Sequence, residues 1–402
     1  MTDTGSDDEP GRDDGPPFVV GVTTSALGSL GAAPGSDWAG WEAERRAPAS
    51  VQGNDTATRF REDAALLADA GIGHVRVVID WARVQPRAGT FDRGALEAER
   101  ERITALVDRG VTPWVALHHV SQPGWFLDDG GFGDDRNRSR HWARFVDEIA
   151  QLVGDLVGGW FPILDPIGWA ANGHLWGLAP PGRQDPEAFA KTVRSAWLAW
   201  ADAWRQLRGP RPVVTAVQLG PIMAADGTVP AAQRTREWDA TTWGSLVSAL
   251  RDGMIDVPGL PLLEVPDLLD SADIIGVIYR GGQRFATEGR PTPWPADKPQ
   301  PWTEGLVETM HRLAEMLPDR PLMIAEHGVS TTGDDRREEL LRVTGAQLRS
   351  MRAEGVPLVG YFHRCAIDGY ETGGGFTSSW GLFDRDRNAR PSLDAFTALS
   401  AP

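Results

Sequence analysis

The sequence contains almost no cysteine, few tyrosines and no long apolar run. Its one cysteine, Cys365, excludes an internal disulfide, so nothing in the chain requires an oxidising compartment. No apolar run approaches the roughly 20 residues that a membrane-spanning helix needs. Basic residues are too few to offset the acidic ones, and the formal net charge of -16 argues against a nucleic-acid-binding surface. These absences predict a soluble, cytoplasmic protein.

The chain is long enough for one large α/β barrel or for two ordinary domains, with 402 residues. Residues 1–17 are rich in Asp, Gly and Pro and lack the basic start and apolar centre of a signal peptide. We predict a disordered acidic tail there. No linker or internal repeat interrupts the remainder, so residues 18–402 are predicted to form one domain.

Short apolar runs alternate with helical patterns along this domain. The predicted strands are residues 18–24, 74–79, 111–117, 160–164, 213–219, 273–279, 322–325 and 357–362. The predicted helices are residues 54–70, 94–109, 139–157, 186–207, 238–250, 302–317, 334–354 and 393–399. Eight strands, most of them followed by a helix, predict an α/β fold with a single (β/α)8 TIM barrel. The loop 280–301, rich in Gly, Pro and Trp, is expected at its rim.

Two carboxylates follow the same local pattern, in which a short apolar strand is ended by an acidic residue and then a Gly or Pro. Glu326 ends the strand 322–325, and Asp165 ends the strand 160–164. Because the active site of such a barrel lies at the C-terminal ends of its strands, these residues predict a catalytic pair. One carboxyl group would protonate a leaving oxygen, and the other would attack an anomeric carbon or activate water. The structural alternatives are a turn residue for Asp165 and an ion-pair partner of Arg76 for Glu326.

Further polar residues are expected at the same strand ends: Arg76, Asp80, His118, His119, Tyr279, Arg364, Asp368 and Glu371. Arg76 and Tyr279 are available to keep a nucleophile ionised and oriented. Neighbours on a strand point in opposite directions, so one of the two histidines should face away from the site. No metal or cofactor is predicted, because the histidine pair lacks the spacing of a helical zinc site and no Gly-rich nucleotide loop or G-x-S-x-G elbow occurs.

In their order along the chain, these motifs resemble family 1 glycoside hydrolases, the β-glucosidase family of retaining (β/α)8 enzymes. The matching stretches are residues 18–26 (FVVGVTTSA), 59–63 (RFRED), 75–83 (VRVVIDWAR), 117–123 (LHHVSQP), 160–166 (WFPILDP), 177–182 (GLAPPG), 324–328 (IAEHG) and 361–382. The resemblance implies that Glu326 is the nucleophile and Asp165 the acid/base residue, supported by Arg76 and Tyr279. It implies substrate-binding roles for His119, Glu371, Trp81 and Arg364.

The chain departs from the family pattern within the same motifs. Asp165 stands where the family has Glu, and it is one methylene shorter. The family's polar sugar-binding side chains are replaced by Leu164, Ile278 and Gly28, and its last motif carries Arg364, Gly369 and Thr372. A glucose-shaped ligand is therefore not expected to be held in the family's usual way.

Two functions remain open at this point. One is hydrolysis of the O-glycosidic bond of a β-glycoside with altered specificity, with retention or inversion of configuration. The other is a non-hydrolytic descendant that binds a ligand or catalyses a different acid/base step in a biosynthetic pathway. Both functions imply a small-molecule glycoside or related ligand and involve neither nucleic acid nor membrane. The sequence does not determine the oligomeric state.

Overall fold

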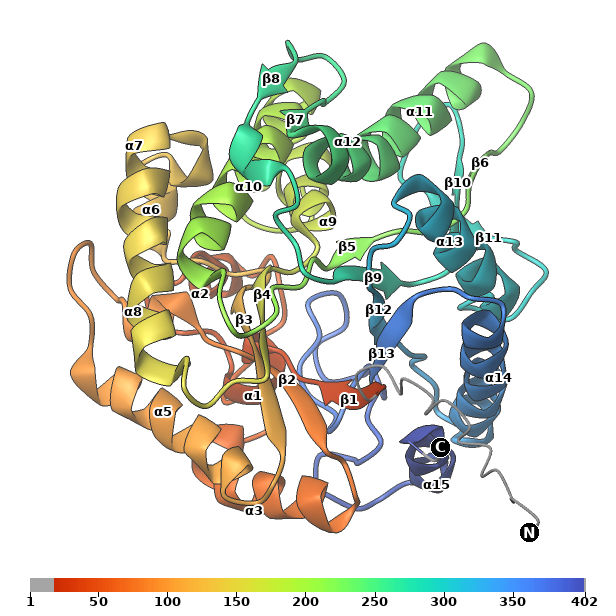
Figure 1. Ribbon diagram of the computed structural model, residues 1–402. Helices are drawn as coiled ribbons and strands as arrows, with labels where there is room; N and C mark the ends of the chain where they lie inside the picture. The colour runs from red at the N-terminus through yellow and green to blue at the C-terminus, as the bar shows by residue number, and fades with distance from the viewer. Residues whose placement is uncertain (1–17, 401–402) are drawn as a thin grey trace, which may run out of the picture.

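The computed structural model describes residues 18–400, in which eight parallel strands form a ring surrounded by helices (Figure 1). The strands are β1 (Val19–Thr23), β2 (His74–Val78), β3 (Thr112–His118), β4 (Gly159–Ile163), β5 (Val217–Gln218), β9 (Ile275–Tyr279), β12 (Leu322–His327) and β13 (Leu358–His363). Their order is β4-β3-β2-β1-β13-β12-β9-β5, and a parallel bridge between Trp160 and Val213 closes the ring. The predicted (β/α)8 barrel is confirmed. The predicted tail, residues 1–17, lies outside the described residues.

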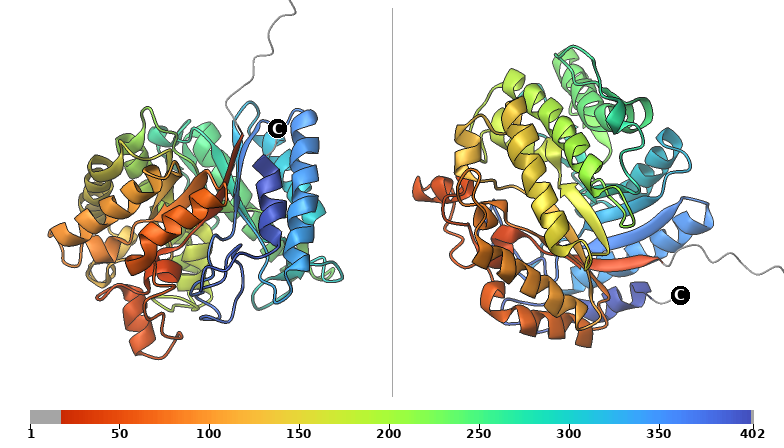
Figure 2. Two further views of the ribbon diagram at one scale, coloured as in Figure 1. Left: turned by 90° about the horizontal axis from the view of Figure 1, so that it is seen from below. Right: turned by 60° about the vertical axis from the view of Figure 1, so that its left-hand side comes forward.

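Helices cover the outside of the ring in chain order (Figures 1 and 2). They include α3 (Thr56–Asp69), α5 (Arg93–Val107), α8 (Ala143–Val153), α10 (Pro186–Leu207), α12 (Ser245–Asp252), α13 (Thr303–Met316), α14 (Asp335–Ala353) and α15 (Ser392–Thr397). The start of α10 shows why the sequence predicts it well. Asp185 accepts hydrogen bonds from two backbone N–H groups of the first turn, and Pro186 takes the first position, where a missing N–H costs nothing.

Strand alternation divides the core into two layers. An inner cluster inside the barrel contains Trp114, Phe161, Ile278 and Phe362 among its members, whereas a larger outer cluster lies between the barrel and the helices. In β9, Ile278 belongs to the inner cluster and Tyr279 to the outer one, as the period of two requires. The next inward position after Ile278 is therefore Arg280.

A β-bulge in β12 changes this alternation where it matters most. The pairing of β12 with β9 shifts register between Ile324 and Glu326. Ala325 lies in the inner cluster, so strict alternation would turn Glu326 outward. The extra residue of the bulge lets Glu326 face the barrel cavity and leaves His327 in the outer layer, against Tyr279 and Tyr361.

Two stretches of the chain contain more structure than the sequence analysis predicts. Between residues 221 and 270 the sequence predicts only the helix 238–250, which overlaps α12; the structure adds α11 (Val229–Asp239) and the short pair β7 (Met254–Ile255) and β8 (Leu263–Glu264). The loop 280–301 contains β10 (Gly282–Phe285) and β11 (Thr292–Trp294), which form a small sheet with β6 (Ile222–Ala224) beside α11 (Figure 1). Within residues 18–400, no helix combines the length and the apolarity needed to cross a membrane.

Candidate functional site

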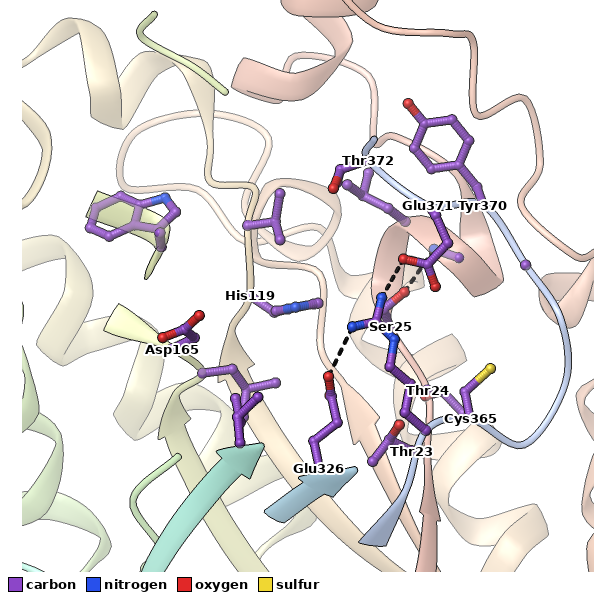
Figure 3. A pocket seen from close by; sticks show the side chains of 18 of the residues that line it. Thr23, Thr24, Ser25, His119, Asp165, Glu326, Cys365, Tyr370, Glu371 and Thr372 are labelled. Atoms are coloured by element: carbon purple, nitrogen blue, oxygen red, sulfur yellow. Dashed lines mark hydrogen bonds and ion pairs between the residues drawn. The ribbon is translucent and has the colours of Figure 1, made fainter. Parts of the chain in front are cut away.

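A cavity of about 340 Å³ opens at the C-terminal ends of the barrel strands (Figure 3). Its walls come from strand ends and from the loops that follow them. The polar lining residues include Thr23, Thr24, Ser25, His119, Asp165, Asn172, Gln218, Arg280, Glu326, Arg364, Glu371 and Thr372. The cavity therefore gathers side chains that are hundreds of residues apart in the sequence, as expected for the top face of such a barrel.

Glu326 lies in this cavity with both carboxylate oxygens held by arginines. Arg76, from β2, donates to Oε2 at 2.5 Å, while Arg280 and Arg364 each donate to Oε1 at 3.0 Å. Burial alone would raise the pKa of Glu326, but the charges of Arg364, Arg280 and Arg76 outweigh burial and hold the pKa far below its usual range. Glu326 is thus a buried carboxylate that stays ionised throughout the physiological pH range.

Asp165 lies where β4 ends, and its backbone has a left-handed conformation with φ of 44°. Its Oδ1 atom accepts hydrogen bonds from the backbone N–H groups of Gly168 and Gln218, both at 3.2 Å. Burial raises the pKa of Asp165, and the charge of Arg280 and these two hydrogen bonds oppose the increase only in part. Asp165 is therefore easier to protonate than a solvent-exposed Asp, unlike Glu326.

The two adjacent histidines have different surroundings, as predicted. His119 lines the cavity between Asp165 and Glu326 (Figure 3), and burial lowers its pKa to about 3, so its ring is neutral at pH 7. His118 is buried against aromatic rings, with its centroid 4.8 Å from that of Trp169. Only His119 is placed to contact a ligand.

Arg364 and Glu371 form the wall next to Glu326. Arg364 donates one N–H to Glu326 and another to Oε2 of Glu371. Its guanidinium carbon also lies 4.3 Å from the ring centroid of Trp380. Arg364 is therefore fixed on three sides, and part of the hydrogen-bonding capacity of Glu371 is already used within the protein.

Two predicted site residues do not reach the cavity. Tyr279 was expected beside Glu326, but it faces outward from β9, and its hydroxyl donates to the backbone oxygen of Trp302 at 2.5 Å. Trp81 was expected to bind substrate, but it is buried in the outer layer, stacked on Phe145 with ring centroids 4.9 Å apart. Both side chains lie on the helix-facing side of the barrel and neither lines this cavity, although Tyr279 lines an adjoining cavity of about 210 Å³ that Glu326 also lines.

The sequence analysis missed several lining residues. Arg280, one position after Tyr279, takes the place beside Glu326, and strand alternation from Ile278 could have indicated it. Gln218, Asn172 and Trp176 carried no comparable sequence signal. In the part of the chain that the structure describes, no group of three His, Cys, Asp or Glu side chains has a geometry suited to a metal ion.

A (β/α)8 barrel with two carboxylates at strand ends is the architecture of many glycoside hydrolases. The family model of Glycosyl hydrolase family 1 matches residues 36–243 of this chain, and the chain belongs to that family. It is 23% identical to β-glucosidase A of Thermotoga maritima over 414 residues, which cover 91% of each chain. It is 24% identical to the thermostable β-glucosidase B of Thermobispora bispora, with 89% of this chain and 84% of that protein covered.

Solved structures support the same fold. The β-glycosidase from Pyrococcus horikoshii superposes with a TM-score of 0.86 at 24% identity, with 95% of this chain and 93% of that chain covered. The β-glucosidase from Thermotoga maritima in complex with glucoimidazole has a TM-score of 0.84 at 20% identity, with 95% and 97% covered. Nearly the whole described chain therefore shares the family's barrel.

Proposed function

We propose that this protein hydrolyses the O-glycosidic bond of a β-glycoside, with Glu326 as nucleophile and Asp165 as acid/base residue. The observation that carries this proposal is the contrast between the two carboxyl groups in one cavity. Glu326 is kept ionised by its arginines, whereas burial favours the protonated form of Asp165. Two carboxyl groups whose pKa values are driven apart are the arrangement that glycoside hydrolysis requires.

The proposed reaction has two steps. In the first, Asp165 gives its proton to the leaving oxygen while a carboxylate oxygen of Glu326 bonds to the anomeric carbon and the glycosidic bond breaks. In the second, Asp165 takes a proton from water, whose oxygen bonds to the anomeric carbon and releases Glu326 as a carboxylate. Two inversions at the anomeric carbon give net retention, as in the relatives that the sequence motifs resemble.

The neighbours of both carboxyl groups fit these roles. Oδ1 of Asp165 is occupied by two backbone N–H groups, which leaves Oδ2 to carry the proton. Arg76 is almost fully buried and also donates to the backbone oxygen of Ala325, so it fixes the strand that presents Glu326. The neutral ring of His119 lies between the two carboxyl groups, where it could bind a sugar hydroxyl as donor or acceptor.

A second candidate function has a specific observation in its favour. Three guanidinium groups bind Glu326, so its lone pairs are less available for attack than those of a carboxylate with fewer partners. In addition, Leu164 and Ile278 give the cavity two apolar walls. A non-hydrolytic descendant would use the same cavity to bind a ligand, or to catalyse a different acid/base step in a biosynthetic pathway.

Mass spectrometry of the intact protein after incubation with 2-deoxy-2-fluoro glycosyl fluorides of several sugars separates the two functions. Fluoride leaves without protonation, so the experiment tests Glu326 independently of Asp165. We expect one covalent adduct in the wild type and none in Glu326→Gln. Glu101→Gln, a matched substitution at an exposed position, should form the adduct like the wild type.

An adduct that persists in Glu326→Gln would disprove the assigned nucleophile. Release of monosaccharide from a natural glycoside without any adduct would instead argue for inversion. If no sugar gives an adduct and no glycoside is cleaved, the non-hydrolytic function is favoured.

A further inference from the structure

The cavity contains an arginine that its protein partners do not use fully. Arg280 follows β9, lines the cavity and donates one N–H to Glu326. Its side chain is 37% exposed, compared with 1% for Arg76 and 16% for Arg364. Within residues 18–400, that bond to Glu326 is the only hydrogen bond of the Arg280 guanidinium group. A guanidinium group has five N–H donors, so most of those of Arg280 have no protein partner among the described residues, and the side chain lines the cavity.

Glu326 does not need Arg280 as a structural partner. Arg76 already binds Oε2 and Arg364 already binds Oε1, so both oxygens would be satisfied without a third guanidinium group. Placing a partly buried positive charge beside two others is unfavourable, and partial burial together with the charge of Arg364 lowers the pKa of Arg280. A purely structural role therefore leaves the position of Arg280 without a reason.

The charges around the cavity indicate which kind of ligand it would bind. Three guanidinium groups form ion pairs with two carboxyl groups: Arg76, Arg280 and Arg364 pair with Glu326, and Arg364 also pairs with Glu371. His119 is neutral, and Asp165 adds no negative charge while it is protonated. While Asp165 is protonated, the three guanidinium groups around Glu326 outnumber the two carboxylates that bind them, in a chain whose formal net charge is -16. A group of cations inside an otherwise acidic protein favours a small anionic ligand, because the rest of the surface would repel a large anionic polymer.

We propose that the cavity takes a glycoside that carries an oxyanion, such as a carboxylate, a sulfate or a phosphate, and that Arg280 binds this group. The open edge of a guanidinium group is a planar fork that matches an oxyanion with two parallel hydrogen bonds. The glycoside part of this inference rests on the proposed function, whereas the oxyanion part rests on the charges and on the open donors of Arg280.

An anionic substrate would also remove an obstacle to the proposed reaction. Glycoside hydrolysis passes through a transition state in which the sugar ring becomes positively charged. Three nearby guanidinium groups oppose that charge, and Glu326 and Glu371 offset only part of their effect until Asp165 has given up its proton. A substrate oxyanion at Arg280 would supply the missing negative charge, so the transition state of an anionic glycoside should be favoured over that of a neutral one.

Isothermal titration calorimetry at low ionic strength tests the inference without requiring hydrolysis. The probes are methyl β-D-glucoside, methyl β-D-glucuronide, and the 6-sulfate and 6-phosphate of methyl β-D-glucoside. We expect at least one anionic probe to bind about 10- to 100-fold more tightly than the neutral glucoside, the range for a charge-assisted hydrogen-bonded pair. Which anionic probe binds best identifies the oxyanion.

Three variants make the assignment specific to Arg280. Arg280→Gln should lose the preference for anionic probes, and Arg280→Lys should keep part of it because the charge remains while the fork is lost. Arg61→Gln, which removes a charge at an exposed site, should behave like the wild type. Thermal unfolding of each variant shows whether it is folded.

Equal or tighter binding of the neutral glucoside would overturn the inference, as would no binding of any anionic probe or an unchanged preference in folded Arg280→Gln. Parallel assays with the 4-nitrophenyl forms of the same sugars keep the two proposals apart. If the neutral form is cleaved and the anionic forms are not preferred, the hydrolysis proposal is supported and the oxyanion-binding proposal is rejected. If anionic probes bind in an Arg280-dependent way but no substrate is cleaved, the oxyanion-binding proposal is supported and the hydrolysis proposal is rejected.

Discussion

The charge of Arg280 acts on Asp165 as well as on Glu326, which gives a pH-dependent test at the scale of single residues. Burial raises the pKa of Asp165, and Arg280 opposes that increase. In the proposed mechanism Asp165 must be protonated for the first step, so activity should fall as the pH rises through the pKa of Asp165. Replacing Arg280 by Leu removes the opposing charge, so the pKa of Asp165 rises and the alkaline limb of the kcat/KM profile moves to higher pH.

The profile should be measured on a neutral substrate, so that lost oxyanion binding does not obscure the shift. Glu326 keeps Arg76 and Arg364, so its own pKa stays low and it does not create a new acidic limb near neutral pH. Arg61→Leu is the control for loss of a surface charge. An alkaline limb that stays in place, or that moves to lower pH, would show that Asp165 is not the group that titrates there.

Asp165 itself gives a second prediction at this scale. Asp165→Asn cannot donate a proton, but it can still accept the hydrogen bonds of Gly168 and Gln218, so the fold should be kept. Cleavage of glycosides with poor leaving groups should fall by about 10²- to 10⁴-fold, whereas bond cleavage with a 2,4-dinitrophenyl leaving group should fall far less. Steady-state kinetics across a series of leaving groups checks this difference. An equal loss for all of them would mean that Asp165 only positions the site.

Individual elements explain why the sequence predicted some site residues and missed others. The carboxylates were predictable because each ends a short apolar strand. Whether each side chain points into the barrel or toward the helices was not predictable. The alternation along a strand depends on where the strand starts and on whether it contains a bulge. The register shift before Glu326 turns that residue inward. In β9 the parity is regular, yet the family resemblance drew attention to Tyr279 instead of Arg280. Loop residues such as Gln218 and Asn172 reach the cavity only through tertiary packing.

The strand β9 also contains a glycine that its neighbours require. A Cβ atom on Gly276 would lie 1.9 Å from the backbone oxygen of Thr215, and this oxygen cannot move without disturbing the strand. We expect Gly276→Ala to lower the free energy of unfolding by about 1–3 kcal/mol or more. Gly40→Ala is the control, because a Cβ there meets nothing within 4 Å and the residue lies in the exposed part of helix α2 (Asp37–Ala43). That change should be neutral or stabilise by up to about 1 kcal/mol.

Denaturant midpoints of the two variants, measured side by side with the wild type, check this prediction. Equal midpoints for Gly276→Ala and the wild type would mean that β9 and the segment near Thr215 can separate without cost. The activity of Gly276→Ala, compared with that of the wild type, would show whether the strand displacement extends to Ile278 and Arg280, two and four residues further along the chain.

For the whole molecule, the alternation of eight apolar strands with helices was enough to predict the barrel, since that pattern has few other solutions. The small sheet of β6, β10 and β11 was not predictable in the same way. Its strands have three or four residues, and two of them lie in a Gly- and Pro-rich segment whose composition indicates a loop. Short strands of this kind form only because the barrel brings their segments together.

The barrel as a whole has one weak seam, between β4 and β5. The strand β5 has two residues, whereas the other seven barrel strands have five to seven. Across the seam, β4 and its end are joined to residues 212–216 by the isolated bridge between Trp160 and Val213 and by a few backbone hydrogen bonds at Trp160 and Asp165. Local opening should therefore begin at this seam.

Hydrogen exchange followed by mass spectrometry should show this weakness directly. We expect amides of residues 213–218 to exchange about tenfold faster or more than those of β12 and β13, whose pairing is extensive. The seam also contacts the proposed acid/base residue, because the N–H of Gln218 donates a hydrogen bond to Asp165 across it. A ligand in the cavity should slow exchange at residues 213–218 together with the segment around Asp165. If residues 213–218 are as protected as β12 without ligand, the seam is not weak, and Asp165 is held as rigidly as Glu326.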